Sequence, residues 1–563
     1  MKKILYTILL SFLILACNAK KDADLKIEAQ VKQEINKISL KEKAKKDSIN
    51  VLLTAEIKKI VIQFDSVHKQ VDKEIIFSKY LLKDSYIDTN YHNLWSSKKN
   101  RDEVVAEMSH AHEHGLVPTD YHLEVIKKYL KNYDTLSLKA HAKLDVLLTD
   151  GIILLAYHLI KGKVNPDGLM YSWNFMENKI PKYALALLQN AIKEEQVSKV
   201  LHSLEPQDNE YQLLKKQLKL NTEIIKNGGW KKVEFKETLH PSEEQEGVVQ
   251  LRTRLIAENY LSKTDTSSSI VYDEKLQKAV KKFQILHGLN GDGVIGKGTL
   301  KIINTSIEKN QEKIICNLER RRWMQYPKDT AYIKVNIASF KMEFIKDKKV
   351  TYESNVVVGK TKNKTPFFMD YLELIVLNPT WTLPYSISSR ETLGKLKRNP
   401  NYLAAHNMFL MDKSGKKISS QGIDWSTISS RNFPYRVRQG PGAGNALGRV
   451  KFLFPNKYAI YLHDTPSKRL FSRDKRAFSH GCIRLENPLQ FAEFLLKKED
   501  ASWDKKKIDK IIATSKTKTI RLKNVYPVLL IYQTAATNKN NELIYYSDVY
   551  KRDAKLYKLL TKK

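Results

Sequence analysis

The 563-residue sequence predicts a multidomain α+β protein, in which two helical regions precede a β-rich domain. Residues 51–235 repeat apolar side chains at helical spacing, as at Val104 and Met108. Residues 243–305 have similar helical spacing and end in a glycine-rich stretch. Apolar and polar residues alternate from Ala331 onward, as they do in strands. A chain of this length accommodates about three or four domains.

The N-terminus has the pattern of a bacterial export signal. Lys2 and Lys3 precede an apolar run, Ile4 to Ala16, that is too short for an ordinary transmembrane helix. The residues Ile-Leu-Ala before Cys17 resemble a bacterial lipobox, in which the cysteine is lipidated and becomes the first residue of the mature protein. We therefore expect residues 1–17 to be a lipoprotein signal peptide and the protein to be a membrane-anchored lipoprotein of the periplasmic cell envelope. The alternative is a cysteine that lies by chance in an ordinary signal peptide.

Residues 18–50 are expected to form a tether. They are rich in Lys, Asp, Glu and Ala and contain few apolar residues, which favours an extended or loosely helical conformation. Such a segment would allow the folded domains to extend away from a lipid anchor.

A histidine cluster in the first helical region raises the question of a metal site. His110, His112 and His114 lie close together, with His122 nearby. The alternative is a helix end, because Gly115 is typical of a helix stop and histidines interact favourably with the negative end of a helix. Neither a cysteine nor a His-Glu-x-x-His pattern accompanies the cluster, so we expect no metal.

The composition favours an acidic partner. Lys and Arg number 97 against 62 Asp and Glu, which gives a formal net charge of +35. Such a charge suits nucleic acid, anionic lipid or a cell-wall polymer, and export argues against nucleic acid. The alternative is a solvated, lysine-rich surface, because the lysines are spread along the chain without an aromatic-interleaved basic stripe.

The β-rich domain is expected to contain its elements in a definite order. The apolar patterns predict strands near 332–340, 342–344, 356–358, 373–377, 453–463 and 526–533, and a helix at 489–496. The segment between Ile387 and Arg449 is loop-rich and contains Trp425 and Tyr435.

Cys482 is the candidate nucleophile of this domain. The residues around it are polar or flexible: Ser479, His480, Gly481 and Arg484. Cationic neighbours lower the pKa of a thiol and raise its reactive thiolate fraction. His463 ends an apolar stretch that is typical of a strand, which would hold an imidazole rigidly as the partner base. An inert buried cysteine, the alternative, would have apolar neighbours.

The motif around Cys482 resembles that of a known enzyme family. His463, a gap of fifteen residues and Ser-His-Gly-Cys-Ile-Arg resemble the active-site motif of the L,D-transpeptidases, bacterial enzymes that cross-link peptidoglycan through a cysteine acyl-enzyme. Segments that resemble the large, scaffold-bearing branch are NLERRRW at 317–323, NPTWTLP at 378–384, NALGRVKFLFPN at 445–456, GLVPTDYH at 115–122 and KGKVNP at 161–166. Residues 243–305, with Tyr272-Asp273, Phe283-Gln284 and the close HGLNGDGVIGKGTL, resemble a small peptidoglycan-binding domain.

This resemblance implies a domain order. It consists of a helical scaffold domain at 51–235, a peptidoglycan-binding domain at 243–305, a catalytic domain at 331–535 with a capping insertion at about 387–449, and a C-terminal tail at 536–563. The stretch 262–269 departs from the tightest peptidoglycan-binding pattern, so the 243–305 module is expected to be either a binder or a spacer.

The resemblance also implies a reaction. Cys482 would attack the carbonyl between the third residue, a diamino acid, and the fourth, D-alanine, of a donor stem peptide. An amine of a neighbouring stem would then resolve the thioester. His463 would accept the thiol proton, and the backbone carbonyl of Asp464 would orient the imidazole.

Backbone N–H groups around Gly481 and Cys482 would form the oxyanion hole, which Ser479, His480 and Arg484 would shape. Arg484 would alternatively hold a substrate carboxylate. Trp425 and Tyr435 would contact the peptide stem from the insertion, with ordinary packing as the alternative. No metal or nucleotide cofactor is required.

Two other functions remain open in the sequence. Water in place of the acceptor amine would make the protein an L,D-carboxypeptidase, and a non-catalytic lipoprotein that anchors the wall is a second class. Cys316 lies among apolar residues, so we expect a buried thiol and no structural disulfide.

Overall fold

The computed structural model describes residues 21–65, 70–166, 182–324, 326–327 and 330–562. These residues form two compact units. The predicted order of a helical N-terminal part followed by a β-rich part is confirmed. Among the described helices, none is long and apolar enough to cross a membrane. The predicted signal peptide and Cys17 lie outside the described residues.

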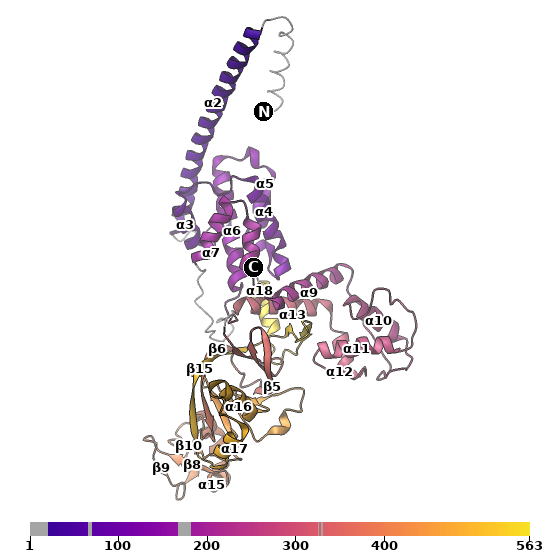
Figure 1. Cartoon of the computed structure of the whole chain (residues 1–563), viewed down its shortest axis with the longest axis vertical. Coiled ribbons are helices and arrows are strands. Elements are labelled where there is room, and N and C mark those ends of the chain that lie inside the picture. Colours follow the sequence, from indigo (N-terminus) through magenta and orange to yellow (C-terminus); the bar gives the residue numbers. More distant parts are fainter. Residues whose placement is uncertain (1–20, 66–69, 167–181, 325, 328–329, 563) are drawn as a thin grey trace. The chain divides into compact units, whose positions relative to one another are not determined.

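The first unit is helical (Figure 1). It contains α2 (Lys21–Ile62), β1 (Gln70–Val71), β2 (Glu74–Ile75), α3 (Lys79–Asp88), α4 (Lys98–His110), α5 (Leu123–Lys131), most of α6 (Leu138–Lys161), α7 (Lys182–Lys193) and α8 (Val197–Leu204). Helix α2 continues through residue 50, where we expected a tether to end. Lys, Glu and Ala dominate its first half and are good helix formers, which accounts for the absence of a break there.

The second unit begins with helices. These are α9 (Asn209–Lys226), α10 (Gly247–Ala257), α11 (Glu274–Leu286), α12 (Lys297–Ile303) and α13 (Ile307–Trp323). Helices α10 to α12 enclose a small core of their own, which includes Leu251, Val280 and Phe283. The residues predicted to form a compact helical module therefore do so.

The β-rich domain is built on a nine-stranded sheet. Its order is β13-β5-β14-β12-β11-β6-β15-β3-β4, and β4 also pairs with β5, so that all strands except β13 close into a ring. The strands are β3 (Tyr332–Asn336), β4 (Lys341–Lys346), β5 (Lys349–Gly359), β6 (Phe368–Leu377), β11 (Val450–Leu453), β12 (Leu462–His463), β13 (Ala477–Ser479), β14 (Ile483–Leu485) and β15 (Lys518–Ile531).

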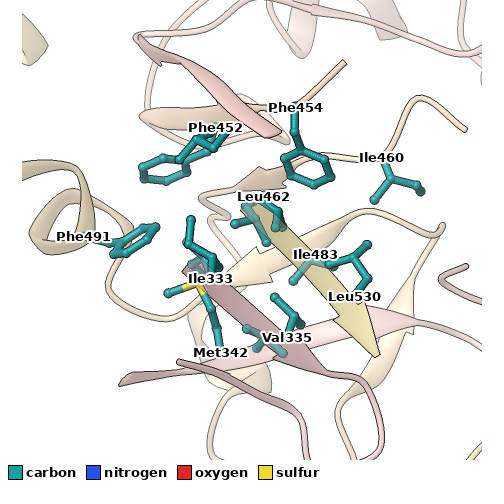
Figure 2. Close-up of a cluster of buried hydrophobic side chains, with 14 of the residues drawn as sticks. Ile333, Val335, Met342, Phe452, Phe454, Ile460, Leu462, Ile483, Phe491 and Leu530 are labelled. Atoms are coloured by element: carbon teal, nitrogen blue, oxygen red, sulfur yellow. The ribbon is translucent and has the colours of Figure 1, made fainter. Parts of the chain in front are cut away.

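Alternating residues of these strands fill the core of the ring. Figure 2 shows Ile333, Val335, Phe452, Leu462, Ile483 and Leu530 in this cluster. Helix α16 (Pro488–Glu499), which was predicted at 489–496, adds Phe491 to the same cluster, and α17 (Lys505–Ala513) follows it. The core thus fixes the ends of β12 and β14, which carry the candidate catalytic residues.

The insertion is a small folded body and begins earlier than predicted. Its sheet has the order β7-β10-β8-β9. The elements are β7 (Trp381–Thr382), a π-helical turn (Ile387–Thr392), α14 (Leu393–Arg398), α15 (Tyr402–Ala405), β8 (Met408–Met411), β9 (Lys417–Ile418) and β10 (Arg436–Gln439). Because β7 pairs with β10, the insertion includes residues from Trp381 rather than only from Ile387.

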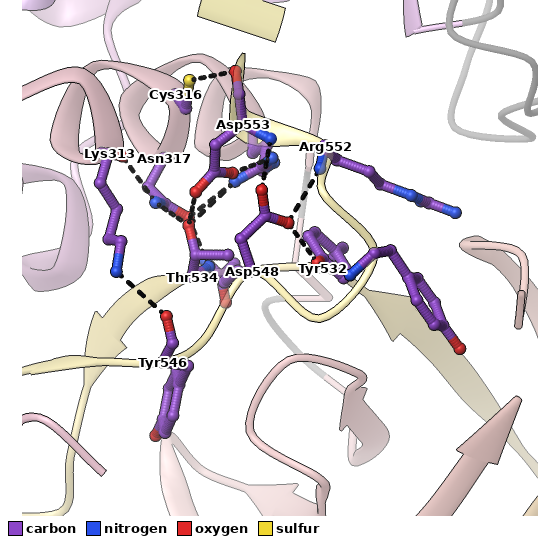
Figure 3. Close-up of polar contacts among 12 residues, drawn as sticks. Lys313, Cys316, Asn317, Tyr532, Thr534, Tyr546, Asp548, Arg552 and Asp553 are labelled. Carbon is purple, nitrogen blue, oxygen red and sulfur yellow. Dashed lines mark hydrogen bonds and ion pairs between the residues drawn. The ribbon is translucent and has the colours of Figure 1, made fainter. Parts of the chain in front are cut away.

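The predicted C-terminal tail is part of the fold. Residues 535–545 form the hairpin β16 (Ala535–Thr537) and β17 (Leu543–Tyr545), and α18 (Asp553–Leu560) follows. Asp553 pairs with Arg320 of α13 at 2.6 Å, and Figure 3 shows Asp553 among the polar contacts of this segment. The prediction of a C-terminal tail at 536–563 is wrong, because this segment forms regular elements and its polar residues contact residues far away in the sequence.

Candidate active site

The register of two strands brings the candidate residues to one face of the sheet. Strands β12 and β14 are parallel, with Leu462 opposite Ile483 and His463 opposite Arg484. Leu462 and Ile483 are fully buried in the core of the ring. Because side chains alternate along strands, His463 and Arg484 face the other side. Cys482 directly precedes Ile483, packs partly against the core and lies near the Arg484 guanidinium.

Tyr461 is the direct neighbour of the thiol. The backbone and side chain of Tyr461 hydrogen-bond to Cys482, and the Trp381 side chain hydrogen-bonds to Tyr461. The Cys482 thiol also donates to the carbonyl of Ala459 at 3.6 Å. Burial raises the pKa of Cys482, and this effect exceeds the opposing effects of Tyr461 and Arg484. The resting thiol is therefore protonated at neutral pH.

His463 is oriented as a base. Its Nδ1 lies 2.5 Å from the carbonyl oxygen of Asp464, the contact that the sequence comparison implied. A carbonyl only accepts, so Nδ1 carries the proton and Nε2 keeps its lone pair. Burial, together with the nearby Arg484 guanidinium, lowers the pKa of His463 to about 3.

These two pKa shifts correct an expectation. The sequence predicted that cationic neighbours lower the pKa of Cys482 and raise its thiolate fraction. Burial instead favours the neutral form of both Cys482 and His463. The structure thus contains a neutral thiol and a neutral imidazole, and the proton has to move when the nucleophile reacts.

The Asp464 side chain supports the loop after β12. Its carboxylate accepts hydrogen bonds from Arg449 N at 2.8 Å, Thr465 N at 2.7 Å and Lys468 Nζ at 2.7 Å. Gly448 has a φ of 59°, and a Cβ there would overlap this carboxylate. Asp464 therefore contributes its carbonyl to His463 and its carboxylate to the loop.

Ser479 and Gly481 shape the backbone around the thiol. The Ser479 hydroxyl donates to the carbonyl of Cys482 at 2.6 Å and accepts from the N–H of Gly481 at 3.0 Å. Gly481 has a φ of 130°, which favours glycine. The predicted role of Ser479 in shaping the loop is compatible with these contacts.

His480 is directed toward the insertion. Its side chain is exposed, and Nε2 lies 2.9 Å from a carboxylate oxygen of Glu391. The sequence grouped His480 with the catalytic residues, whereas its partner Glu391 belongs to the π-helical turn of the insertion. His480 therefore connects the nucleophile loop to the insertion.

Arg484 carries an available positive charge on the active face. Its side chain is half-buried, and among the residues that the structure describes its Nε has no hydrogen-bond partner. Burial lowers the pKa of Arg484, and proximity to Cys482 opposes that shift. A half-buried guanidinium whose Nε donor is unused is suited to an anionic group of a ligand.

The two predicted aromatic contacts lie in the core of the insertion. Trp425 is 4% exposed and packs with Leu396 and Val437. Tyr435 is half-buried beside it, with ring centroids 6.0 Å apart. The expectation that Trp425 is exposed over a substrate groove is wrong, because the insertion has a hydrophobic core that needs this side chain.

The sequence analysis missed Tyr461, although the signal was present. Tyr461 lies two residues before His463 in a strand-like stretch, and strand residues two apart share a face. The partners Glu391 and Trp381 had no local signal, because the insertion brings them in from about 70 to 100 residues away.

The remaining titratable residues do not form a metal site within the described residues. His114 pairs with Glu205 at 3.1 Å. His122 lies between Glu74 and Asp150, 2.9 Å from each. Cys316 is buried, and its thiol donates to the Asp553 carbonyl at 3.4 Å.

A cysteine and a histidine that both adjoin Tyr461 and Arg484 are the residue types that enzymes with a cysteine nucleophile use. Residues 330–511 match the family model "L,D-transpeptidase catalytic domain". Residues 80–218 match "Scaffold domain", and residues 244–303 match "Putative peptidoglycan binding domain". Residues 330–511 therefore match the catalytic domain of the L,D-transpeptidases, and the resemblance predicted from the sequence is confirmed.

A curated relative has a name that refers to the same enzyme family. The "Putative L,D-transpeptidase" of Haemophilus influenzae is 36% identical over 286 residues, which cover 49% of this chain and 57% of the relative. This chain thus spans little more than half of the relative's length.

Two solved structures are also similar. The Ldtfm–avibactam carbamoyl enzyme shares 14% identity over 40% of this chain and 61% of its own, with a TM-score of 0.18. The L,D-transpeptidase of Xylanimonas cellulosilytica shares 13% sequence identity over 53% of this chain and 99% of its own, with a TM-score of 0.16. Such scores establish no shared fold, so the family models carry the assignment.

Proposed function

We propose that this protein is a peptidoglycan L,D-transpeptidase that cross-links stem peptides through a thioester on Cys482. The observation that carries the proposal is that Cys482 and His463 both adjoin Tyr461 and Arg484 inside the matched catalytic domain. The peptidoglycan-binding domain match supports peptidoglycan as the substrate.

In the first step, the Cys482 sulfur attacks the carbonyl between the diamino acid and D-alanine of the donor stem. His463 Nε2 takes the thiol proton as the carbon–sulfur bond forms. Burial makes the resulting imidazolium a strong acid, so it returns the proton to the departing D-alanine nitrogen. The carbon–nitrogen bond breaks, and a thioester remains on Cys482.

In the second step, an acceptor amine attacks the thioester carbonyl and passes its proton to His463. The carbon–sulfur bond breaks, and the proton returns to Cys482. Each proton that leaves a nucleophile is thus delivered to a leaving group, and the enzyme returns to its neutral resting state.

Tyr461 is our candidate for a side-chain donor to the oxyanion, beside the Cys482 N–H. Burial raises the pKa of Tyr461 well above its usual value, so the hydroxyl stays protonated, and the bond from Trp381 orients it. Tyr461→Phe should lower kcat about 10-fold, and loss of its hydrogen bond to the thiol should move the alkylation profile of Cys482 toward higher pH. An unchanged kcat would remove Tyr461 from the mechanism.

Arg484 is our candidate for binding a carboxylate of the stem peptide, because its Nε is buried and available. Arg484→Lys keeps the charge but loses the planar fork, so it should raise KM more than it lowers kcat. An unchanged KM in Arg484→Lys would exclude this contact.

Lipid at Cys17 would hold the enzyme at the periplasmic membrane surface, within the cell envelope. The N-terminal sequence pattern supports this location. Cys17→Ser should release the protein from membranes, and full retention of that variant would contradict the anchor.

The test of the reaction is mass spectrometry of stem-peptide products after incubation of wall fragments with the mature chain. Cross-linked dimers support transpeptidation, whereas shortened monomers would identify an L,D-carboxypeptidase. Cys482→Ala should give neither product. Wild-type protein that leaves the fragments unchanged would point to a non-catalytic anchoring role.

A further inference from the structure

The nucleophile loop crosses the end of strand β5. Strand β13 pairs with β5 in parallel and β14 pairs with it on the other side, antiparallel. Ala477 lies opposite Val358, and Arg484 lies opposite Val357. Residues 480–482 must therefore pass over the end of β5, and the backbone there supports the loop.

Thr365 joins the loop to this strand end. Its hydroxyl donates to the carbonyl of Gly481 at 2.7 Å and accepts from the N–H of Gly359 at 2.9 Å. Thr365 is fully buried. A Cβ at Gly359 would overlap the carbonyl of Asn363, so the turn from Gly359 to Thr365 is tight and has little freedom.

The bond to the Gly481 carbonyl sets the direction of a catalytic donor. In a trans peptide the C=O and the following N–H point in opposite directions. Holding the Gly481 carbonyl on Thr365 therefore turns the N–H of Cys482 to the opposite side. The proposed mechanism uses that N–H to stabilise the oxyanion.

Tyr550 fixes the same turn from the C-terminal segment. Its hydroxyl donates to the carbonyl of Gly359 at 2.6 Å and accepts from the N–H of Thr365 at 3.1 Å. The Tyr550 ring is 2% exposed and stacks on Tyr532, with centroids 5.6 Å apart and planes 9° apart. One hydroxyl thus bridges both ends of the turn.

The segment that carries Tyr550 is itself anchored (Figure 3). Asp548 accepts from the Tyr532 hydroxyl at 2.5 Å and from the N–H groups of Arg552 and Asp553 at 2.9 Å each. Asp553 pairs with Arg320 of α13. A continuous set of hydrogen bonds therefore runs from α13 through residues 548–553 to the turn.

We propose that Thr365 and Tyr550 are positioning residues that hold the nucleophile loop in its reactive conformation, through Gly481 and Gly359 respectively. The kinetic consequence of this role rests on the proposed acyl transfer, whereas its structural consequence does not. The C-terminal segment is then a support of the active site.

The test uses hydroxyl deletions in the full chain. Thr365→Val removes both hydrogen bonds at nearly constant shape, Thr365→Ser restores them, and Tyr550→Phe removes the second support. Two matched controls remove hydroxyls that donate to carbonyls elsewhere in the domain. They are Thr517→Val, whose donor lies 2.7 Å from the Asn378 carbonyl, and Tyr352→Phe, whose donor lies 3.1 Å from that of Asn487.

Thr365→Val should lower the kcat of acyl-enzyme formation by about 10- to 100-fold with little change in KM, because the donor is misdirected rather than the binding site lost. Tyr550→Phe should lower kcat by about 3- to 10-fold, because Tyr550 contacts Gly359 and Thr365 and reaches the nucleophile loop only through them. Thr365→Ser should recover most of the rate, and alkylation of Cys482 at high pH should be unchanged in every variant.

Hydrogen exchange of the peptide that covers 477–485 provides a readout independent of the reaction. Exchange should be faster in Thr365→Val and Tyr550→Phe than in the two controls. Wild-type exchange and wild-type kcat in Thr365→Val would overturn the proposal. If the wild-type protein forms no acyl-enzyme, the proposed function fails, and exchange alone decides the positioning role. Should Thr365→Val not fold, Tyr550→Phe decides by the same measurements.

Discussion

Each unit buries a histidine, and the two imidazoles have opposite electrostatic surroundings. In the first unit, burial alone would lower the pKa of His122, but hydrogen bonds and charge from Asp150 and Glu74 raise it above the usual value. In the second unit, burial and the nearby Arg484 lower the pKa of His463 to about 3. Burial is common to both, so the charge of the partner decides the sign.

The difference separates a structural histidine from a base. His122 lies between two carboxylates that raise its pKa, and it ties β2 and α6 together. Burial and the Arg484 charge keep His463 neutral, while the Asp464 carbonyl fixes the proton on Nδ1 and leaves the Nε2 lone pair to accept a proton. A perturbed pKa alone would not distinguish the two, whereas the partners do.

The largest expected effect is on the base. His463→Ala should lower the turnover of the proposed reaction by about 10²-fold or more, because a positioned proton acceptor is lost. His406→Ala removes an exposed imidazole of the insertion and serves as the control, with a rate within about 2-fold of wild type. Wild-type turnover in His463→Ala would end the assignment of His463 as the base.

Removing the structural histidine should affect stability instead of chemistry. His122→Ala leaves the Asp150 carboxylate buried without its cation, so the first unit should lose about 3 kcal/mol of unfolding free energy. Hydrogen exchange resolved by peptide would measure this loss. Acylation of Cys482 should be unchanged, and a fall in acylation equal to that of His463→Ala would break the comparison.

The pH dependence of stability should have opposite signs in the two units. The pKa of His122 is raised on folding. Its contribution to the stability of the first unit is therefore present below a pH of about 6.5 and is lost as the pH rises through the pKa of the folded state. Asp145, whose pKa burial raises to about 6, acts in the same direction between about pH 4 and 6.

In the second unit, burial lowers the pKa of His463 and His287 to about 3. Their contribution to the stability of this unit is therefore lost as the pH falls from about 6.5 toward 3. Hydrogen exchange at pH 5 and pH 8.5 should therefore show the second unit weakened by acid and the first by base. The same pH trend in both units would contradict these assignments.

Local patterns predicted the parts of the molecule that depend on near neighbours in sequence. The helix at Pro488, the strands before Gly359 and the motif that contains Cys482 all follow from spacing over a few residues. The contact between His463 and the Asp464 carbonyl is likewise between adjacent residues. Each of these features therefore has a local signal in the sequence.

The predictions that were wrong concern residues whose surroundings come from distant parts of the sequence. Trp425 was expected to be exposed, but Leu396 and Val437 enclose it. The C-terminal segment was expected to be a tail, but Tyr550 reaches Gly359, almost two hundred residues away in sequence. Burial also set the charge of the resting thiol, and burial depends on packing that no local pattern contains.

The most direct test of a neutral resting pair is the pH profile of Cys482 alkylation by iodoacetamide, read on the Cys482 peptide by mass spectrometry. The structure predicts slow alkylation at neutral pH, a midpoint above the value of about 8.5 typical of a free cysteine, and little change at low pH in His463→Ala. A fast plateau between pH 5 and 7 that disappears in His463→Ala would instead demonstrate a preformed thiolate–imidazolium pair and contradict this account.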